Sequence, residues 1–279
     1  MAEREDRRTR AHMTRGHHLI SLAAGVMPEF SPQQTVASAA ASGWPGVGIW
    51  YDPDTWTPAT TIEVRDRAAD ADLVLLDIEV VWLKPGPDDP AHFAAIDAGA
   101  AIGARNVLVV SSEPDPGDTA DKLGRLVEHG RAAGLRVCLE FAAFTSVGSL
   151  GAALDIIARA GPDTGLLIDP LHFARTGARP ADLAGLDPRL FPYAQFCDAP
   201  ASGPSPADVA AIIHEALDLR LMPGEGGLPL TQLLDELPAQ IPLSIELRSA
   251  ALRDGWPDPA DRARVLLEAT RRWLAGPAA

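Results

Sequence analysis

Four short apolar runs of this sequence carry an acidic or amide side chain in their last positions. These residues are Glu140 in RVCLEF, Asp169 in GLLIDP, Gln195 in YAQFCDA and Glu246 in PLSIELRS. Carboxylates that converge in one buried place repel each other, and their pKa values rise unless a cation neutralises them. Oxygen ligands on successive elements suit a divalent metal ion. The pattern predicts a metal site if the fold brings the four run ends together.

Two of these acids also have a purely structural explanation. Asp169 is placed to cap the turn that follows it, and Glu246 is placed to pair with Arg248. Arg248 follows Glu246 by two residues, so both side chains lie on the same side of an extended strand. Arg248 is therefore a candidate either for holding Glu246 or for binding a carboxylate or phosphate of a substrate.

The apolar runs belong to a regular alternation that has to position these residues. Strands are expected at 18–24, 47–50, 72–81, 106–112, 136–141, 165–170, 193–199 and 242–249. Ala-rich amphipathic segments separate them, as in βα units. Eight nearly continuous hydrophobic strands that alternate with helices predict an α/β fold, a single (β/α)8 TIM barrel. A doubly wound sheet is the alternative, but no GxGxxG follows the first strand and no P-loop sequence occurs.

The length and the spread of turn residues indicate one domain. A barrel needs about 250 residues, and the chain has 279. Its 25 prolines and 24 glycines are distributed among turns and do not gather in one hinge. We expect a mobile tail over 1–15 and a catalytic barrel over 16–279, with the site at the carboxyl ends of the strands.

Charge and hydropathy exclude several classes of partner. With 24 basic and 38 acidic residues the net charge is -14, which repels nucleic acid and anionic lipid. No apolar stretch reaches the roughly 18 residues that span a bilayer, and the start lacks the apolar centre of a signal peptide. Cys138 and Cys197 lie inside apolar runs and are expected to be buried free thiols. We predict a cytoplasmic protein with a small-molecule substrate and possible homo-oligomers.

The order of the motifs resembles a known family. The segments are LEF with Glu140, IDPLHFARTG with Asp169 and His172, a strand that ends in CDA, PGEG with Glu225, and SIELRS with Glu246. This succession is similar to the xylose isomerase-like barrels, the sugar phosphate isomerase/epimerase group. The resemblance covers roughly residues 17–275 and is strongest over 136–249.

The resemblance implies a set of site residues. Glu140, Asp169, the residue at 195 and Glu246 would be the metal ligands, and His172 would lie in the substrate pocket. Members of the family use Mn, Mg, Co or Zn, and in the epimerases the two ligand glutamates also act as acid and base.

The sequence departs from the epimerases at three positions. Gln195 stands where they usually have His, and an all-oxygen set favours Mg, Mn or Co over Zn. A Gln here resembles the 3-dehydroshikimate dehydratases of the same superfamily. Ala201 and Ser146 stand where the keto-sugar epimerases have an Arg and a Glu, which argues against a keto-hexose substrate.

The chemistry expected of such a site starts with removal of a weakly acidic proton next to a carbonyl. A metal ion stabilises the enolate, and Glu140 and Glu246 approach the substrate from two faces as base and acid. Reprotonation gives isomerisation or epimerisation, whereas loss of a β-hydroxyl gives dehydration. We predict a metal-dependent isomerase or epimerase of a small sugar or polyhydroxylated carbonyl compound. The alternative is a dehydratase of the 3-dehydroshikimate or inosose type.

Further residues are candidates for the substrate pocket. They are His172, Glu79 and Trp82 at the end of the third strand, Glu225 between two glycines, and Arg248. A Schiff-base aldolase is disfavoured because Lys84 and Lys122, the only lysines, fall in a loop and a helix. An endonuclease-like barrel would need a basic groove and more His and Asp ligands. A non-catalytic binding barrel, with Gln195 as the sign of a decayed site, stays open as an alternative.

Overall fold

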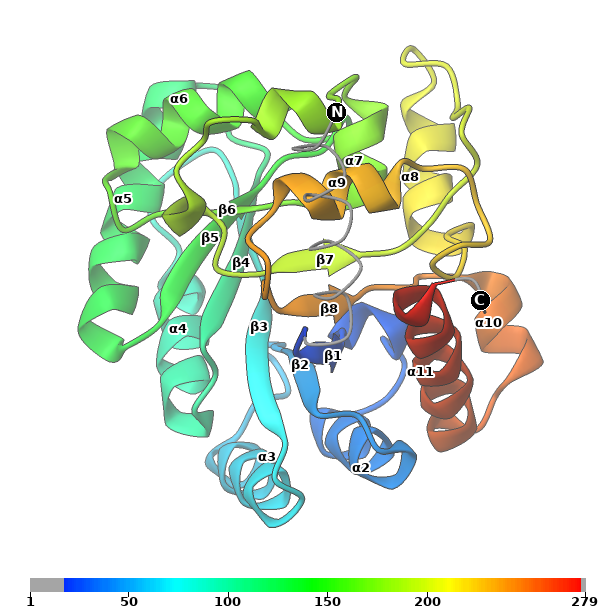
Figure 1. Cartoon of the computed structure of the whole chain (residues 1–279). Helices are drawn as coiled ribbons and strands as arrows, with labels where there is room; N and C mark the ends of the chain where they lie inside the picture. The colour runs from blue at the N-terminus through cyan, green and yellow to red at the C-terminus, as the bar shows by residue number, and fades with distance from the viewer. Residues whose placement is uncertain (1–17, 277–279) are drawn as a thin grey trace.

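The computed structural model describes residues 18–276, and in it eight parallel strands form a nearly closed barrel (Figure 1). The strands are β1 (Ile20–Leu22), β2 (Gly46–Trp50), β3 (Val74–Leu83), β4 (Asn106–Ser111), β5 (Arg136–Glu140), β6 (Gly165–Leu167), β7 (Ala194–Phe196) and β8 (Leu243–Ile245). Their order is β6-β5-β4-β3-β2-β1-β8-β7. A single parallel bridge between Ile168 and Ala194 joins the two end strands.

Helices lie around the outside of the strands (Figure 1). The α-helices are α2 (Pro32–Ser42), α3 (Pro58–Asp70), α4 (Pro90–Ile102), α5 (Pro116–Ala133), α6 (Leu150–Ala160), α7 (Pro170–Arg175), α8 (Val209–Asp218), α9 (Leu230–Glu236), α10 (Ala250–Gly255) and α11 (Pro259–Ala275). Three 3-10 turns are η1 (Ala24–Val26), η2 (Pro180–Leu183) and η3 (Pro188–Leu190).

Local sequence sets the ends of these helices. Ser31 and Pro32 begin α2, because Ser31 accepts from the Gln34 amide while Gln34 caps the Ser31 amide in return. Gly134 ends α5 in the left-handed region with φ of 84°, where a residue without Cβ is favoured. The predicted barrel is confirmed.

Two apolar layers hold the barrel together. Along β4, Val107 and Val109 belong to the large cluster between strands and helices, whereas Leu108 and Val110 belong to a small second cluster with residues of other strands. This alternation follows the two-residue period of a strand. The second cluster fills the barrel interior, so the polar site lies on top of a packed core.

A bulge in β3 precedes two buried acids. The pairing of β2 with β3 passes from Val47–Leu75 to Gly48–Asp77, which leaves Leu76 as an extra residue. The Asn106 side-chain amide donates to the Leu76 carbonyl over 2.8 Å and so satisfies the disrupted ladder.

The predicted tail, residues 1–15, lies outside the described residues. Within residues 18–276, no helix combines the length and the hydropathy that a membrane crossing requires.

Candidate metal centre

The four predicted ligands meet at the carboxyl ends of neighbouring strands. Glu140 is the last residue of β5, Gln195 lies in β7, and Asp169 and Glu246 follow β6 and β8 within two residues. All four side chains are buried. Because parallel strands end on one edge, successive strand ends converge at one mouth.

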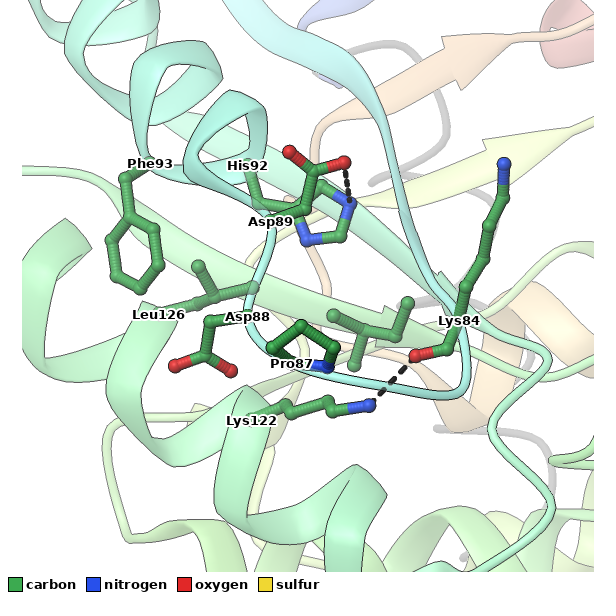
Figure 2. A pocket seen from close by; sticks show the side chains of 9 residues that line it. Lys84, Pro87, Asp88, Asp89, His92, Phe93, Lys122 and Leu126 are labelled. Carbon is green, nitrogen blue, oxygen red and sulfur yellow. Dashed lines mark hydrogen bonds and ion pairs between the residues drawn. The ribbon is translucent and has the colours of Figure 1, made fainter.

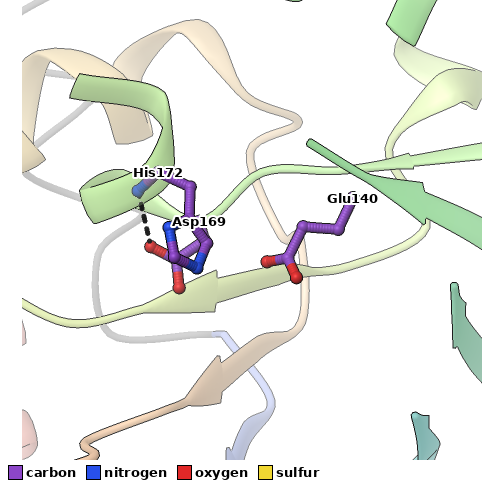
Figure 3. A group of neighbouring side chains, drawn as sticks. All are labelled: Glu140, Asp169 and His172. Carbon is purple, nitrogen blue, oxygen red and sulfur yellow. Dashed lines mark hydrogen bonds between the residues drawn. The ribbon is translucent and has the colours of Figure 1, made fainter. Parts of the chain in front are cut away.

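Glu140, Asp169 and His172 form the tightest part of this group. One candidate ligand atom from each lies within 4.8 Å of the other two, and the Glu140 carboxylate points toward the other two residues (Figure 3). Asp169 Oδ1 accepts from the backbone amides of Leu171 at 2.7 Å and His172 at 3.2 Å. Asp169 therefore caps α7, as its structural explanation predicts, and also faces the site.

Arg220 is the main residue that sequence reasoning missed. Its Nη1 donates to Asp169 Oδ2 over 2.5 Å, and its Nη2 lies 3.1 Å from Glu246 Oε2. Ala201 stands at the position where an Arg was sought, but the chain brings Arg220 in after α8. Leu221 and Asp198 exchange two backbone hydrogen bonds of 2.8 and 2.9 Å, which pull this segment against the end of β7. A lone cation in the apolar run LRLMPG was the available signal.

The remaining contacts of Arg220 fix His172 as well. Arg220 Nη2 lies 3.3 Å from His172 Nε2, and a guanidinium only donates, so Nε2 accepts and the neutral ring carries its proton on Nδ1. Burial lowers the pKa of His172 to about 4. Burial alone would raise the pKa of Asp169, but Arg220 and His172 outweigh it and lower the pKa to about 2. Asp169 is therefore a permanent anion next to a neutral imidazole.

The two glutamates behave differently from Asp169. Burial raises the pKa of Glu140 well above its usual value, and the charges of Asp169 and Glu246 add to the rise. Burial also raises the pKa of Glu246, although Arg220 opposes it. Glu140 Oε1 is buried without a hydrogen-bond partner among the described residues. Such an oxygen is costly unless a cation or a donor reaches it.

Gln195 is oriented by Glu79. Gln195 Nε2 donates to Glu79 Oε2 over 3.3 Å, and the Gly25 amide donates to Glu79 Oε1 over 3.2 Å. This leaves Gln195 Oε1 buried and without a partner within the described chain. The amide oxygen, and not the nitrogen, is thus free for a cation. Burial raises the pKa of Glu79 well above its usual value, and the charge of Asp77 raises it further.

A glycine leaves room beside Glu246. A Cβ on Gly25 would stand 2.6 Å from Glu246 Oε1, closer than real Cβ contacts allow. An oxygen-rich divalent cation site fits this arrangement. Glu140 and Gln195 offer free oxygens, Asp169 is anionic, and there is space at Glu246. His172 adds a nitrogen to the neighbourhood, which ions of intermediate softness also accept.

Asp77 is a second acid that sequence reasoning did not single out. It is fully buried, and Ser244 Oγ lies 3.5 Å from its Oδ1. Burial raises its pKa to about 7, with Glu246 adding to the rise. Gly48 gives it space, because a Cβ there would lie 3.0 Å from both Asp77 oxygens.

Three predicted pocket residues, Trp82, Glu225 and Arg248, are not part of the Glu140, Asp169 and His172 group. Trp82 is partly exposed, donates to Ser112 Oγ over 2.6 Å and lines a hollow of about 380 Å³ with Tyr51. Glu225 is exposed and lines another hollow, of about 370 Å³, with Trp273. Arg248 does not pair with Glu246 and instead lies over the ring of Trp50, 5.9 Å from its centroid. The substrate roles of these residues stay predictions.

Asp198 explains why the PGEG segment is ordered. Its Oδ2 accepts from the amides of Gly224 and Gly226, both at 3.0 Å, and its Oδ1 accepts from Leu228 at 3.1 Å and Ala199 at 2.8 Å. Every acceptor position of this carboxylate is used within the loop. Asp198 is thus a structural residue that fixes the segment after Arg220.

A second acid-rich group lies over the ends of β3 and β4 and is fully paired. Lys122 Nζ donates to Glu113 Oε2 and to the Lys84 carbonyl, both at 2.7 Å (Figure 2). Arg125 donates to both oxygens of Asp88 at 2.6 and 2.7 Å. The hollow between these residues measures only about 10 Å³, room for about one water molecule.

Comparison with known proteins identifies the family. A family model described as the xylose isomerase-like TIM barrel matches residues 36–273. The chain belongs to this family. Among curated proteins, none matches the sequence.

Several other proteins of known structure share the fold of this chain at low sequence identity. A xylose isomerase-like TIM barrel/4-hydroxyphenylpyruvate dioxygenase fusion protein is 20% identical with a TM-score of 0.76, over 90% of this chain and 42% of that one. The chain thus spans less than half of the fusion protein. An IolI protein with a bound zinc atom is 16% identical with a TM-score of 0.76, over 92% and 97% of the two chains. D-psicose 3-epimerase from Clostridium cellulolyticum H10, with D-tagatose, is 11% identical with a TM-score of 0.66, over 91% and 99%.

Proposed function

We propose that this barrel is a divalent-metal-dependent isomerase or epimerase of a small sugar or polyhydroxylated carbonyl compound. One observation carries the proposal: Glu140 and Gln195 each hold a buried, unpartnered oxygen beside the anionic Asp169. Buried acceptors without donors are rare in folded proteins, and a cation is what completes them. Family membership and the epimerase and IolI neighbours support an enzyme of this class.

Glu140, Asp169, Gln195 and Glu246 would hold the ion. Their oxygen donors favour Mn, Mg or Co over Zn, although the IolI neighbour carries zinc. The bound ion would act as a Lewis acid toward the carbonyl and hydroxyl oxygens of the substrate. Glu79 supports the set from behind, because it keeps the Gln195 oxygen directed into the site.

Glu140 and Glu246 are the acid and base in this proposal. Their strands, β5 and β8, are three apart in a ring of eight, so their side chains approach the mouth from different sides. Burial raises the pKa of each above its usual value, which favours a carboxyl group that can hold a proton before it returns it to the substrate. Asp169, with a pKa near 2, keeps its charge throughout.

Arg220 is a positioning residue. Its Nε donates to the Ala216 carbonyl at 2.8 Å, Nη1 reaches Asp169 and Nη2 reaches Glu246 and His172. With each nitrogen occupied, Arg220 has little left to offer a substrate. It holds Asp169 and Glu246 in place, and it leaves the Nδ1 proton of His172 available for a substrate oxygen.

Dehydration is the second candidate outcome at the same site. Gln195, in the place where His is usual for the epimerases, supports it, as do Ala201 and Ser146. Both reactions begin with abstraction of the same proton and differ only in whether a β-hydroxyl leaves.

A substrate screen tests the proposal. Keto-sugars, inososes and 3-dehydroshikimate are incubated with the Mn²⁺- or Mg²⁺-loaded protein and followed by NMR. A product of equal mass indicates isomerisation or epimerisation, and loss of water indicates dehydration. Metal-dependent turnover that vanishes in Glu140→Gln is expected. A preparation that binds no divalent ion would contradict the proposal, and it would favour a non-catalytic barrel.

Location, oligomeric state and the absence of nucleic-acid partners stay predictions. Cys138 and Cys197 are buried and unpaired, which is compatible with the expected reducing cytoplasm.

A further inference from the structure

A hollow of about 180 Å³ opens beside the metal centre. Its lining includes Gly25, Glu29, Arg248, Arg253 and Arg262. Gly25 is shared with the centre, because its amide donates to Glu79 and a Cβ on it would collide with Glu246 Oε1. The hollow and the proposed ligands therefore meet at one residue that has no side chain.

The Arg248 side chain passes next to Gly25, between the hollow and the candidate metal centre. A Cβ on Gly25 would lie 3.4 Å from Arg248 Cδ, so the missing side chain lets the arginine pass over the end of β1. The guanidinium reaches Trp50 at the end of β2, 5.9 Å from the ring centroid. The cation–π contact holds the guanidinium over the mouth without neutralising its charge.

Arg248 also differs from its two arginine neighbours in having no ion pair. Arg253 lies 3.4 Å from Asp218 and 3.3 Å from Asp254, and Arg262 lies 2.7 Å from Glu29. Among the described residues no carboxylate comes within 4.0 Å of Arg248, and its Nε is buried without a partner. A buried N–H of a charged group without an acceptor is costly, which points to an acceptor that arrives with a ligand.

Charge at the mouth narrows the ligand. Five buried acids lie around the mouth, namely Asp77, Glu79, Glu140, Asp169 and Glu246. Their negative charge disfavours a phosphate dianion more than a monoanion, and the one guanidinium without an ion pair matches a single negative charge. A carboxylate also suits the planar fork of an arginine.

We propose that the hollow beside Gly25 is an anion subsite in which Arg248 binds a carboxylate carried by the substrate. The proposal rests on the proposed function, since it assigns the substrates of that centre to the class of hydroxylated carbonyl acids. Neutral sugars would leave Arg248 without its acceptor. Binding of the carboxylate would place the adjoining carbons of the substrate toward Glu246.

Matched acids and neutral analogues test the subsite by binding alone. Calorimetry on the Mg²⁺-loaded protein compares shikimate with methyl shikimate, and cyclohexanecarboxylate with cyclohexanecarboxamide. We expect at least one acid to bind about 10- to 100-fold more tightly than its neutral partner, the value of one charge-assisted pair. Arg248→Met should abolish the preference, and Arg248→Lys should keep part of it. Arg264→Met, an exposed arginine that pairs with Asp261 and does not line the hollow, should leave it unchanged.

Several results would overturn the subsite. The wild type could bind acid and neutral analogue equally, or bind neither acid. The acid preference could persist in Arg248→Met, which would show that the acid binds the metal ion. Glycerol phosphate could bind more tightly than both acids. Circular dichroism of each variant shows whether the fold is kept. Failure of the proposed function looks different, because no turnover or metal binding would be seen while an Arg248-dependent acid preference persisted.

Discussion

Two groups of acids and cations lie near the carboxyl ends of the strands, and they differ in burial and in how completely they are paired. Around Lys122, Glu113 and Asp88 each face a cation within 2.7 Å, and almost no free volume remains. Around Asp169, one guanidinium serves two carboxylates, while oxygens of Glu140 and Gln195 have no partner among the described residues.

The comparison teaches that pairing, more than composition, separates a structural cluster from a candidate site. A closed group stabilises the loop that it joins and has no vacancy for a ligand. A group with desolvated, unmatched acceptors costs stability in the free protein. Such a cost is typical of functional sites, where a bound ion or substrate offsets it.

The largest expected effect is on activity. Glu140→Gln and Glu246→Gln should each lower kcat by about 10²- to 10⁴-fold, because each removes a proton-transferring carboxylate. Rates are measured by NMR on a substrate found in the screen, at saturating metal. Glu128→Gln on the exposed face of α5 is the matched control and should be neutral. Full activity in both site variants would refute their assigned roles.

In the cluster around Lys122, a substitution should change stability and leave metal binding unchanged. Glu113→Gln leaves Lys122 as a buried ammonium without its anion, so it should lower the free energy of unfolding. Urea denaturation measures the loss, and metal affinity should stay unchanged. In Glu140→Gln the metal-free protein should keep its stability or gain some, because a neutral amide replaces a repelled carboxylate. Equal destabilisation of both variants would remove the distinction between the clusters.

The sequence was sufficient for the barrel, because the alternation of apolar runs and helices is a local pattern. That the four candidate residues hold a metal ion stays a prediction. Each strand appears as an apolar run, and the ligands lie at run ends, where the barrel topology brings them together. Arg220 was missed because its place depends on how the segment after α8 folds back against Asp198, which no periodicity records. Asp77 was missed because a bulge at Leu76 shifts the alternation of β3.

The orientation of Gln195 gives a smaller and more specific effect. Glu79→Leu removes the acceptor that holds Nε2, so the amide is free to turn its nitrogen toward the ion. We expect metal affinity to fall about 10- to 100-fold, the usual effect of losing such a supporting contact. Calorimetric titration with Mn²⁺ measures it, with Glu128→Gln as control. Unchanged affinity would show that Glu79 does not orient the ligand.

A separate effect is the pH dependence of stability without metal. Burial raises the pKa of Asp77 to about 7 and those of Glu79 and Glu140 well above the usual range. Above pH 6.5, where His172 is neutral in both the folded and the unfolded state, the folded state holds protons that the unfolded chain has released. Stability should therefore fall as pH rises through this window, by about 1.4 kcal/mol per pH unit for each retained proton.

Metal should reverse this trend, because the ligands must lose their protons to bind it. Thermal unfolding with EDTA and with Mn²⁺, at pH 6.5 to 8, measures both slopes. A metal-free protein that becomes more stable toward pH 8 would contradict the assigned shifts.

Anomalous X-ray scattering from crystals grown with Mn²⁺ tests the central claim most directly. The account predicts one strong peak within about 2.0 to 2.4 Å of oxygens from Glu140, Asp169, Gln195 and Glu246. A matched crystal of Glu140→Gln should show a weakened peak or none. A wild-type crystal with no peak at this mouth, or with manganese bound elsewhere on the barrel, would contradict the account.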